Sequence, residues 1–245
     1  MVTPTDVEKP YSSQLRAAQA QATRRSIVSA AATLFVERGY GATSIDAIAE
    51  AAGVSRKTVF TSVGGKLETL KLALDWAIVG DDAPVPVLER PHVQAALAEP
   101  DARRILRDFA TNILEVMGRT APLLRVLESA AGLDADLRAL NDDLRAQRQH
   151  GMSFLAALLA ERGALRADLT EREAADVLWL LNECGPYTRF VTEQGWSPER
   201  YQAWLADSLL ALLISPGYRP ASTPPRARRP RGSASRRTPT SGPDA

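Results

Sequence analysis

Residues 43–62 read TSIDAIAEAAGVSRKTVFTS, and this stretch decides the fold. Apolar side chains recur at i, i+3, i+4 and i+7 from Ile45 to Ala52, which is the pattern of a short helix with one buried face. Thr43, followed three residues later by Asp46, is similar to the capping box that opens a helix, and Gly53 interrupts the pattern. The first half of the stretch therefore predicts a short helix that begins after Thr43.

A second short helix follows in the same stretch. Ser55 is placed to cap this helix, and Val59 faces inward. Gly53 lets the chain turn sharply between the two helices, while Val54 anchors the turn by burying its side chain. Such a helix-turn-helix projects its second helix, so that the first half of this helix can enter the major groove of DNA, which is roughly 12 Å wide. An ordinary helical hairpin with basic surface residues is the alternative.

The outward side of the second helix carries the candidate DNA contacts. Arg56 and Lys57 are the expected base readers, because both can donate to O6 and N7 of guanine. A solvated or phosphate-only role is the alternative for both. Hydroxyl, backbone N–H and ammonium groups near the helix starts are expected to hold phosphates. The full expected DNA-binding set is Thr43, Ser44, Ser55, Arg56, Lys57, Thr58, Phe60, Thr61, Ser62 and Lys66.

Helical periodicity continues along nearly all of the chain after residue 22, without a sustained strand-like alternation. The predicted fold class is all-α, with an N-terminal three-helix helix-turn-helix domain and a C-terminal antiparallel helical bundle. The first helix is expected from Thr23 to Arg38 with Gly39 as its stop, and a longer helix from about Lys66 to Val79. The Ala/Gln-rich segment 14–22 would extend the first helix by a turn or more.

Composition divides the chain into five segments. Prolines and two aspartates between residues 80 and 91 break helices, and the arginine- and proline-rich end cannot bury enough apolar surface to fold. That end either adds non-specific DNA affinity or is a passive solubilising tail. The expected segments are 1–22, a partly disordered arm; 23–79, the DNA-binding domain; 80–91, a Pro-rich connector; 92–217, the ligand-binding and dimerisation domain, with helices near 92–98, 102–118, 121–131, 134–161, 171–193 and 198–214; and 218–245, a disordered tail.

Composition also excludes several classes of protein. The single cysteine, Cys184, cannot form an intrachain disulfide, and with His92 and His150 it gives no zinc spacing, so neither a metal nor a cofactor is expected. Cys184 is expected to be a packed small side chain. The longest apolar runs are too short to span a bilayer, and the chain begins without a signal-like segment, which favours a cytoplasmic protein.

The motifs together are similar to one known family. Residues 41–49 (GATSIDAIA), 52–55 (AGVS), 58–60 (TVF) and 66–70 (KLETL) resemble the N-terminal domain of the tetracycline-repressor (TetR) family. The resemblance covers about residues 23–72. The chain departs from the family pattern at Phe60, where tyrosine is usual, so the phenolic hydroxyl that tyrosine offers to a phosphate is missing. A Gly-Gly pair, residues 64 and 65, replaces a more polar linker.

The resemblance implies a homodimeric repressor that a small, apolar ligand releases from a palindromic operator. The dimer would form through the helices at about 171–193 and 198–214, whose apolar stripes otherwise belong to an intramolecular core. Polar or aromatic residues that interrupt apolar faces are expected to line the ligand cavity, although ordinary packing explains each of them equally well. These residues are Phe109, Met117, His150, Phe154, Trp179, Asn182, Glu183 and Tyr187.

Two other functions are alternatives to this one. A constitutive DNA binder would use the helical body for dimerisation alone, and a body without a cavity would favour it. The sequence gives little support for an enzyme, because residues 64–67 (GGKL) lack the upstream glycine and the following Ser/Thr of a phosphate-binding loop. No nucleophile, base and orienting residue stand out either, so no catalytic residue is expected.

Overall fold

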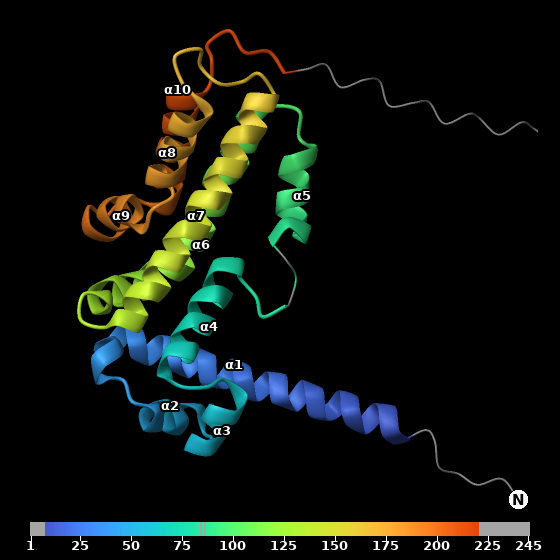
Figure 1. Cartoon of the computed structure of the whole chain (residues 1–245), viewed down its shortest axis with the longest axis vertical. Coiled ribbons are helices and arrows are strands. Elements are labelled where there is room, and N and C mark those ends of the chain that lie inside the picture. Colours follow the sequence, from blue (N-terminus) through green and yellow to red (C-terminus); the bar gives the residue numbers. More distant parts are fainter. Residues whose placement is uncertain (1–7, 84, 86, 221–245) are drawn as a thin grey trace, which may run out of the picture.

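The computed structural model describes residues 8–83, 85 and 87–220, and these residues form helices with one isolated antiparallel bridge between Leu165 and Ile214. A small head of four helices lies at one end of a longer helical body (Figure 1). The predicted all-α fold is confirmed. The expectations for residues 1–7 and for the tail beyond Pro220 lie outside the described residues.

The first helix is longer than the apolar pattern alone predicts. Helix α1 spans Glu8–Ala42, so it includes the Ala/Gln-rich segment 14–22, of which every residue is exposed. Its buried face begins only at Ile27 and Val28. The predicted stop at Gly39 is present as a break inside the helix, because Gly39 has φ 79°, a left-handed conformation that favours glycine.

Three shorter helices complete the head, and the body follows after a connector. The head helices are α2 (Ile45–Ala52), α3 (Arg56–Ser62) and α4 (Lys66–Val79). The body contains the 3-10 turn η1 (Val87–Glu89), α5 (Pro91–Ala98), α6 (Ala102–Ala131), α7 (Ala135–Glu161), α8 (Glu171–Leu181), α9 (Cys184–Tyr187), the π-helical segment η2 (Thr188–Glu193) and α10 (Pro198–Leu213).

Two proline-containing segments differ from expectation in opposite directions. Helix α6 is continuous through Pro122, where two helices were expected, and it buries side chains on both sides of the proline. The single helix expected over 171–193 is instead divided into α8, α9 and η2. The break between α8 and α9 lies at Glu183, whose backbone is extended (φ −87°, ψ 157°).

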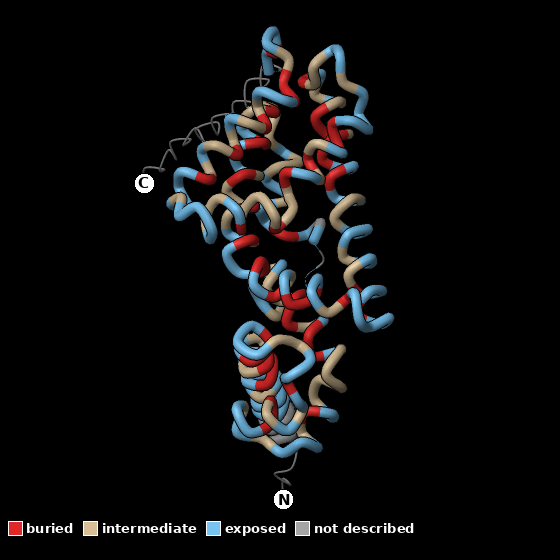
Figure 2. Tube along the Cα trace, turned by 90° about the vertical axis from the view of Figure 1, so that its left-hand side faces the viewer, coloured by how far each residue is buried: buried red, intermediate tan, exposed pale blue. Residues whose placement is uncertain are grey.

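The head shares its hydrophobic core with the body. Leu123 and Leu127 near the end of α6, and Leu137 near the start of α7, are at most 4% exposed and pack with the core of α1 and α4. Figure 2 shows buried segments continuing from the head into this junction. The far part of the body has a separate core, to which Tyr201 and Leu205 of α10 contribute. The junction therefore fixes the head on the body through apolar packing.

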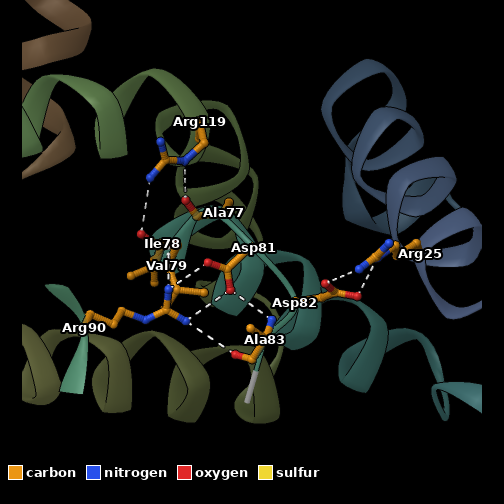
Figure 3. A network of polar contacts seen from close by, with 9 residues as sticks. All are labelled: Arg25, Ala77, Ile78, Val79, Asp81, Asp82, Ala83, Arg90 and Arg119. Atoms are coloured by element: carbon orange, nitrogen blue, oxygen red, sulfur yellow. Dashed lines mark hydrogen bonds and ion pairs between the residues drawn. The ribbon is translucent and has the colours of Figure 1, made fainter. Parts of the chain in front are cut away.

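Polar contacts hold the connector that joins α4 to the body (Figure 3). On the head side, Arg25 of α1 donates from Nε and Nη2 to the two carboxylate oxygens of Asp82, at 2.6 and 2.7 Å. This pairing lowers the pKa of Asp82 to about 2. On the body side, Arg90 Nη1 donates to Asp81 at 2.8 Å, and Arg119 Nε donates to the carbonyl of Ala77 at 2.9 Å. The end of α4 is thus tied to both parts of the molecule.

Candidate nucleic-acid interface

Side-chain caps and one glycine define the angle between α2 and α3. The hydroxyl of Ser44 accepts from the backbone N–H of Ala47 at 3.1 Å, and the hydroxyl of Ser55 accepts from that of Thr58 at 3.1 Å. Between the helices, Gly53 has φ 68°, which closes α2 in the left-handed conformation. The predicted helix-turn-helix is therefore present, with Ser44 as the cap of α2 where Thr43 was expected.

The inner face of α3 is anchored in the core of the head. Val59 is 0% exposed and packs in the same cluster as Phe35 of α1, Ile48 of α2 and Leu70 of α4. Burying a side chain of this size stabilises the fold by roughly 1.5–3 kcal/mol. Because the core fixes its inner face, the opposite face of α3 is presented to solvent.

The residues expected to read bases lie on that exposed face. Arg56, Lys57, Phe60 and Thr61 are all exposed. Arg56 Nη1 donates to Asp46 Oδ2 at 2.7 Å, and its guanidinium lies 5.6 Å from the centroid of the Phe60 ring. A helix with an exposed basic first turn and a buried opposite face has the geometry needed to lie in a DNA groove.

The remaining hydroxyl groups of α3 serve partly to hold the helix. Ser55 Oγ and Thr58 Oγ1 share a hydrogen bond of 2.8 Å at its first turn. Thr61 Oγ1 donates to the carbonyl of Lys57 at 3.0 Å, and Ser62 is half-buried at the helix end. Ser44 and Ser55 remain exposed beside the starts of α2 and α3 and are placed as expected for phosphate contacts.

Two of the residues expected to contact phosphates, Thr43 and Lys66, bond within the head instead. Thr43 is 1% exposed, and its hydroxyl donates inward to the carbonyls of Leu34 and Gly39, near the end of α1. Its hydroxyl therefore cannot reach a phosphate. Lys66 Nζ donates to the carbonyl of Tyr40 at 2.9 Å and lies 4.2 Å from the centroid of the Tyr40 ring. The ammonium of Lys66 thus ties α4 to the end of α1.

Asp46 is the residue at this surface that sequence reasoning missed. Its position in the first turn of α2 suggested only a capping role, yet its carboxylate faces the guanidinium of Arg56 across the turn. The sequence does contain a feature that could have predicted this pair: two opposite charges occupy the first turns of consecutive helices that meet at a sharp turn.

The expected ligand-binding residues divide into three groups. The first group, Trp179, Asn182 and Glu183, lies near Arg148 and Met152. Glu183 accepts a hydrogen bond from Arg148 at 2.8 Å, and the guanidinium of Arg148 lies 5.2 Å from the centroid of the Trp179 ring. Asn182 Nδ2 contacts Met152 Sδ at 3.6 Å. Met117, Phe109 and Tyr187 belong to the body core or pack against it. His150 and Phe154 are exposed on α7, so neither lines the interior of the body, and the expectation for both is wrong.

The helical period of α7 explains this correction. Met152, Leu155 and Ala156 face the core, so the positions on the opposite side of the helix face solvent. A surface depression of about 370 Å³ lies at the far end of the body, and none of the expected ligand-binding residues borders it. Its lining residues are Arg103, Asp207, Leu210, Ala211, Ile214, Ser215 and Pro216.

The part of the chain that the structure describes has neither a cluster of metal ligands nor a membrane-spanning helix. No group of three or more His, Cys, Asp or Glu side chains in residues 8–83, 85 and 87–220 is arranged to hold a metal ion. Over the same residues, none of the helices has the length and hydropathy needed to cross a membrane. Cys184 is buried, and burial together with the nearby Glu128 carboxylate raises the pKa of its thiol to about 11.

The helix-turn-helix region is similar to that of known bacterial regulatory proteins. The model of "Bacterial regulatory proteins, tetR family" matches residues 27–68, which contain the C-terminal part of α1, all of α2 and α3 and the start of α4. The HTH-type transcriptional regulator SrpR of Pseudomonas putida is 43% identical over 58 residues, which is 24% of this chain and 27% of that protein. The HTH-type transcriptional regulator EthR of Mycobacterium tuberculosis is 25% identical over 79% of this chain and 86% of its own length.

Solved structures extend the likeness to the body. NalD of Pseudomonas aeruginosa superposes with a TM-score of 0.62 at 24% identity, over 80% of this chain and 98% of its own. At that identity the likeness shows the fold alone, which is a helix-turn-helix head on a helical body. Residues 27–68 therefore match the tetR family of bacterial regulatory proteins, and over most of its length the chain is similar to a transcriptional regulator.

Proposed function

We propose that this regulator is a homodimeric repressor that binds a palindromic operator through α3 and is released by a small ligand bound in the body. The observation that carries the proposal is the exposed basic start of α3 on a head that shares its core with α6 and α7. NalD is described as a secondary repressor, which supports repression over activation. Because the partner is chromosomal DNA, the site of action would be the cytoplasm.

Arg56 and Lys57 would contact base edges in the major groove, while Ser44 and Ser55 lie beside backbone N–H groups at helix starts and would hold phosphates. In the described chain the side chain of Lys57 has no intramolecular partner, so its ammonium is available to DNA. Thr43 is left out of this set because its hydroxyl is bonded inside the head.

Replacing both Arg56 and Lys57 by alanine should abolish specific DNA binding. Each good contact of this kind contributes on the order of 1–3 kcal/mol, so affinity for the DNA upstream of the chain's own gene should fall about a hundredfold or more in a gel-shift titration. The control replaces Arg104 and Arg107 by alanine, two exposed arginines at the start of α6, far from the head. Equal affinity of the two double variants would contradict the assignment of α3 as the reader.

A dimer through α8 and α10 is proposed on the side chains that remain exposed there. Most of the apolar stripe of α10 packs inside the chain, since Tyr201, Leu205 and Leu209 are 0% exposed. Leu180 of α8 and Leu212 of α10, in contrast, are 58% and 47% exposed. A two-fold contact through such residues would also give the symmetry that a palindromic operator requires.

Leu180→Glu should convert the dimer to a monomer at micromolar concentration, because it places a charge in an apolar interface. Analytical ultracentrifugation measures the change, and operator affinity should fall with it. Leu133→Glu is the matched control, because Leu133 is 94% exposed in the turn between α6 and α7. The interface would be placed elsewhere if both variants sedimented like the wild-type protein.

Unpartnered donors in the body support a ligand that carries hydrogen-bond acceptors. Within the described residues, Arg148 Nε, Trp179 Nε1 and the Tyr201 hydroxyl are buried without a hydrogen-bond partner. A buried donor left without an acceptor costs about 1–3 kcal/mol, which an acceptor on a bound ligand would recover. SmeT, a structural neighbour with a TM-score of 0.59, has been solved as a complex with triclosan. We therefore propose a small, mainly apolar ligand with an acceptor group beside Arg148 and Trp179.

The dye 1-anilinonaphthalene-8-sulfonate, which is aromatic and carries acceptor oxygens, is a suitable first probe. Its fluorescence should rise on saturable binding to the wild-type protein, with about tenfold weaker affinity for Trp179→Phe, which loses the unpartnered indole N–H. Trp76→Phe, the same substitution in α4 of the head, should leave dye affinity unchanged. Equal dye affinity for both variants would favour the alternative of a constitutive DNA binder whose body serves dimerisation alone.

A further inference from the structure

We propose that Asp46 is a positioning residue that makes Arg56 selective for guanine; this inference rests on the proposed DNA-binding function. Arg56 is held at two points. Its Nη1 donates to Asp46 Oδ2 at 2.7 Å, and its guanidinium carbon lies 5.6 Å from the centroid of the Phe60 ring. Asp46 stands in the first turn of α2 and Arg56 in the first turn of α3, so the pair bridges the two helices of the motif.

This arrangement leaves one edge of the guanidinium available. Arg56 Nε and Nη2 donate no hydrogen bond within the part of the chain that the structure describes. An edge of two parallel N–H groups is the donor pair that matches O6 and N7 of guanine in the major groove. The carboxylate and the phenyl ring thus fix the inner side of the guanidinium and leave its outer edge as a guanine reader.

The pair can orient Arg56 without withdrawing it from DNA. The side chains of Arg56 and Asp46 are 59% and 64% exposed, and an ion pair in such an environment is weak. Asp46 nevertheless limits the rotamers of a long side chain, so less conformational freedom is lost when the guanidinium meets a base. Phe60, which is 47% exposed, adds a stacking surface on the same side chain.

Asp46 also reduces the attraction between Arg56 and DNA phosphates. A guanidinium already paired with a carboxylate attracts phosphates less, so it contributes less to sequence-independent affinity. Its contribution to binding is then made mainly through hydrogen bonds to base edges. The expected role of Asp46 is therefore to raise the ratio of specific to non-specific affinity, at some cost to total affinity.

The test compares Asp46→Asn with Glu50→Gln, each of which removes one exposed negative charge from α2. Wild-type protein first selects duplexes from a random double-stranded library, and Arg56→Lys identifies which selected guanine depends on Arg56. Affinities are then measured for the selected duplex, for the same duplex with that guanine pair changed to an A·T pair, and for an unrelated duplex, over a series of salt concentrations.

For Asp46→Asn, we expect the preference for guanine at that position to fall about tenfold, with unchanged or tighter binding to the unrelated duplex and a steeper salt dependence. Glu50→Gln should keep the wild-type preference and Asp46→Glu should restore most of it. An Asp46→Asn protein with the wild-type guanine preference would overturn the inference, as would a selected site without an Arg56-dependent guanine. If wild-type protein selects no duplex at all, the proposed function itself fails.

Discussion

The packing of the head against the ends of α6 and α7 is the constraint on which the rest of the structure depends. The apolar faces of α1 and α4 cannot be buried by the short helices α2 and α3 alone, and Leu127 and Leu137 of the body, at 0% and 1% exposed, complete that core. Burial of such side chains stabilises by roughly 1.5–3 kcal/mol each, which is large against the marginal stability of a domain. The direction in which α3 points is therefore set by the body as well as by the head.

This shared core gives the body a physical route to the DNA surface. Helix α4 packs in the head core, and its last turn is bonded to Arg119 of α6, while Asp82 just beyond it is bonded to Arg25 of α1. Under the proposed function, a ligand that shifts α6 would act on α4 and, through α4, on the spacing of the two recognition helices in the proposed dimer. A ligand can shift this equilibrium only by as much as it favours one arrangement over the other.

The features that could be predicted from the sequence are those with local causes. Caps, the glycine turn and helical periodicity act within a few residues, and they located the helix-turn-helix correctly. Features that depend on how separate segments pack were missed: the Thr43 hydroxyl turns inward to the carbonyls of Leu34 and Gly39, and Asp46 meets Arg56 only once the two helices cross. Periodicity also could not tell that Phe154 faces solvent on α7, since apolar residues occur on both of its faces. The roles of the pocket residues and of the dimer helices remain predictions.

The most direct test of the account is protection of guanine N7 from dimethyl sulfate on operator DNA bound by the full-length protein. Guanine N7 lies in the major groove, so a recognition helix seated there should shield it. The account predicts two clusters of protected guanines, one per half-site, whose centres lie about 10–10.5 base pairs or a multiple apart, as a two-fold dimer requires. Tight binding without N7 protection, or with a single cluster, would contradict a symmetric dimer that reads the major groove through α3.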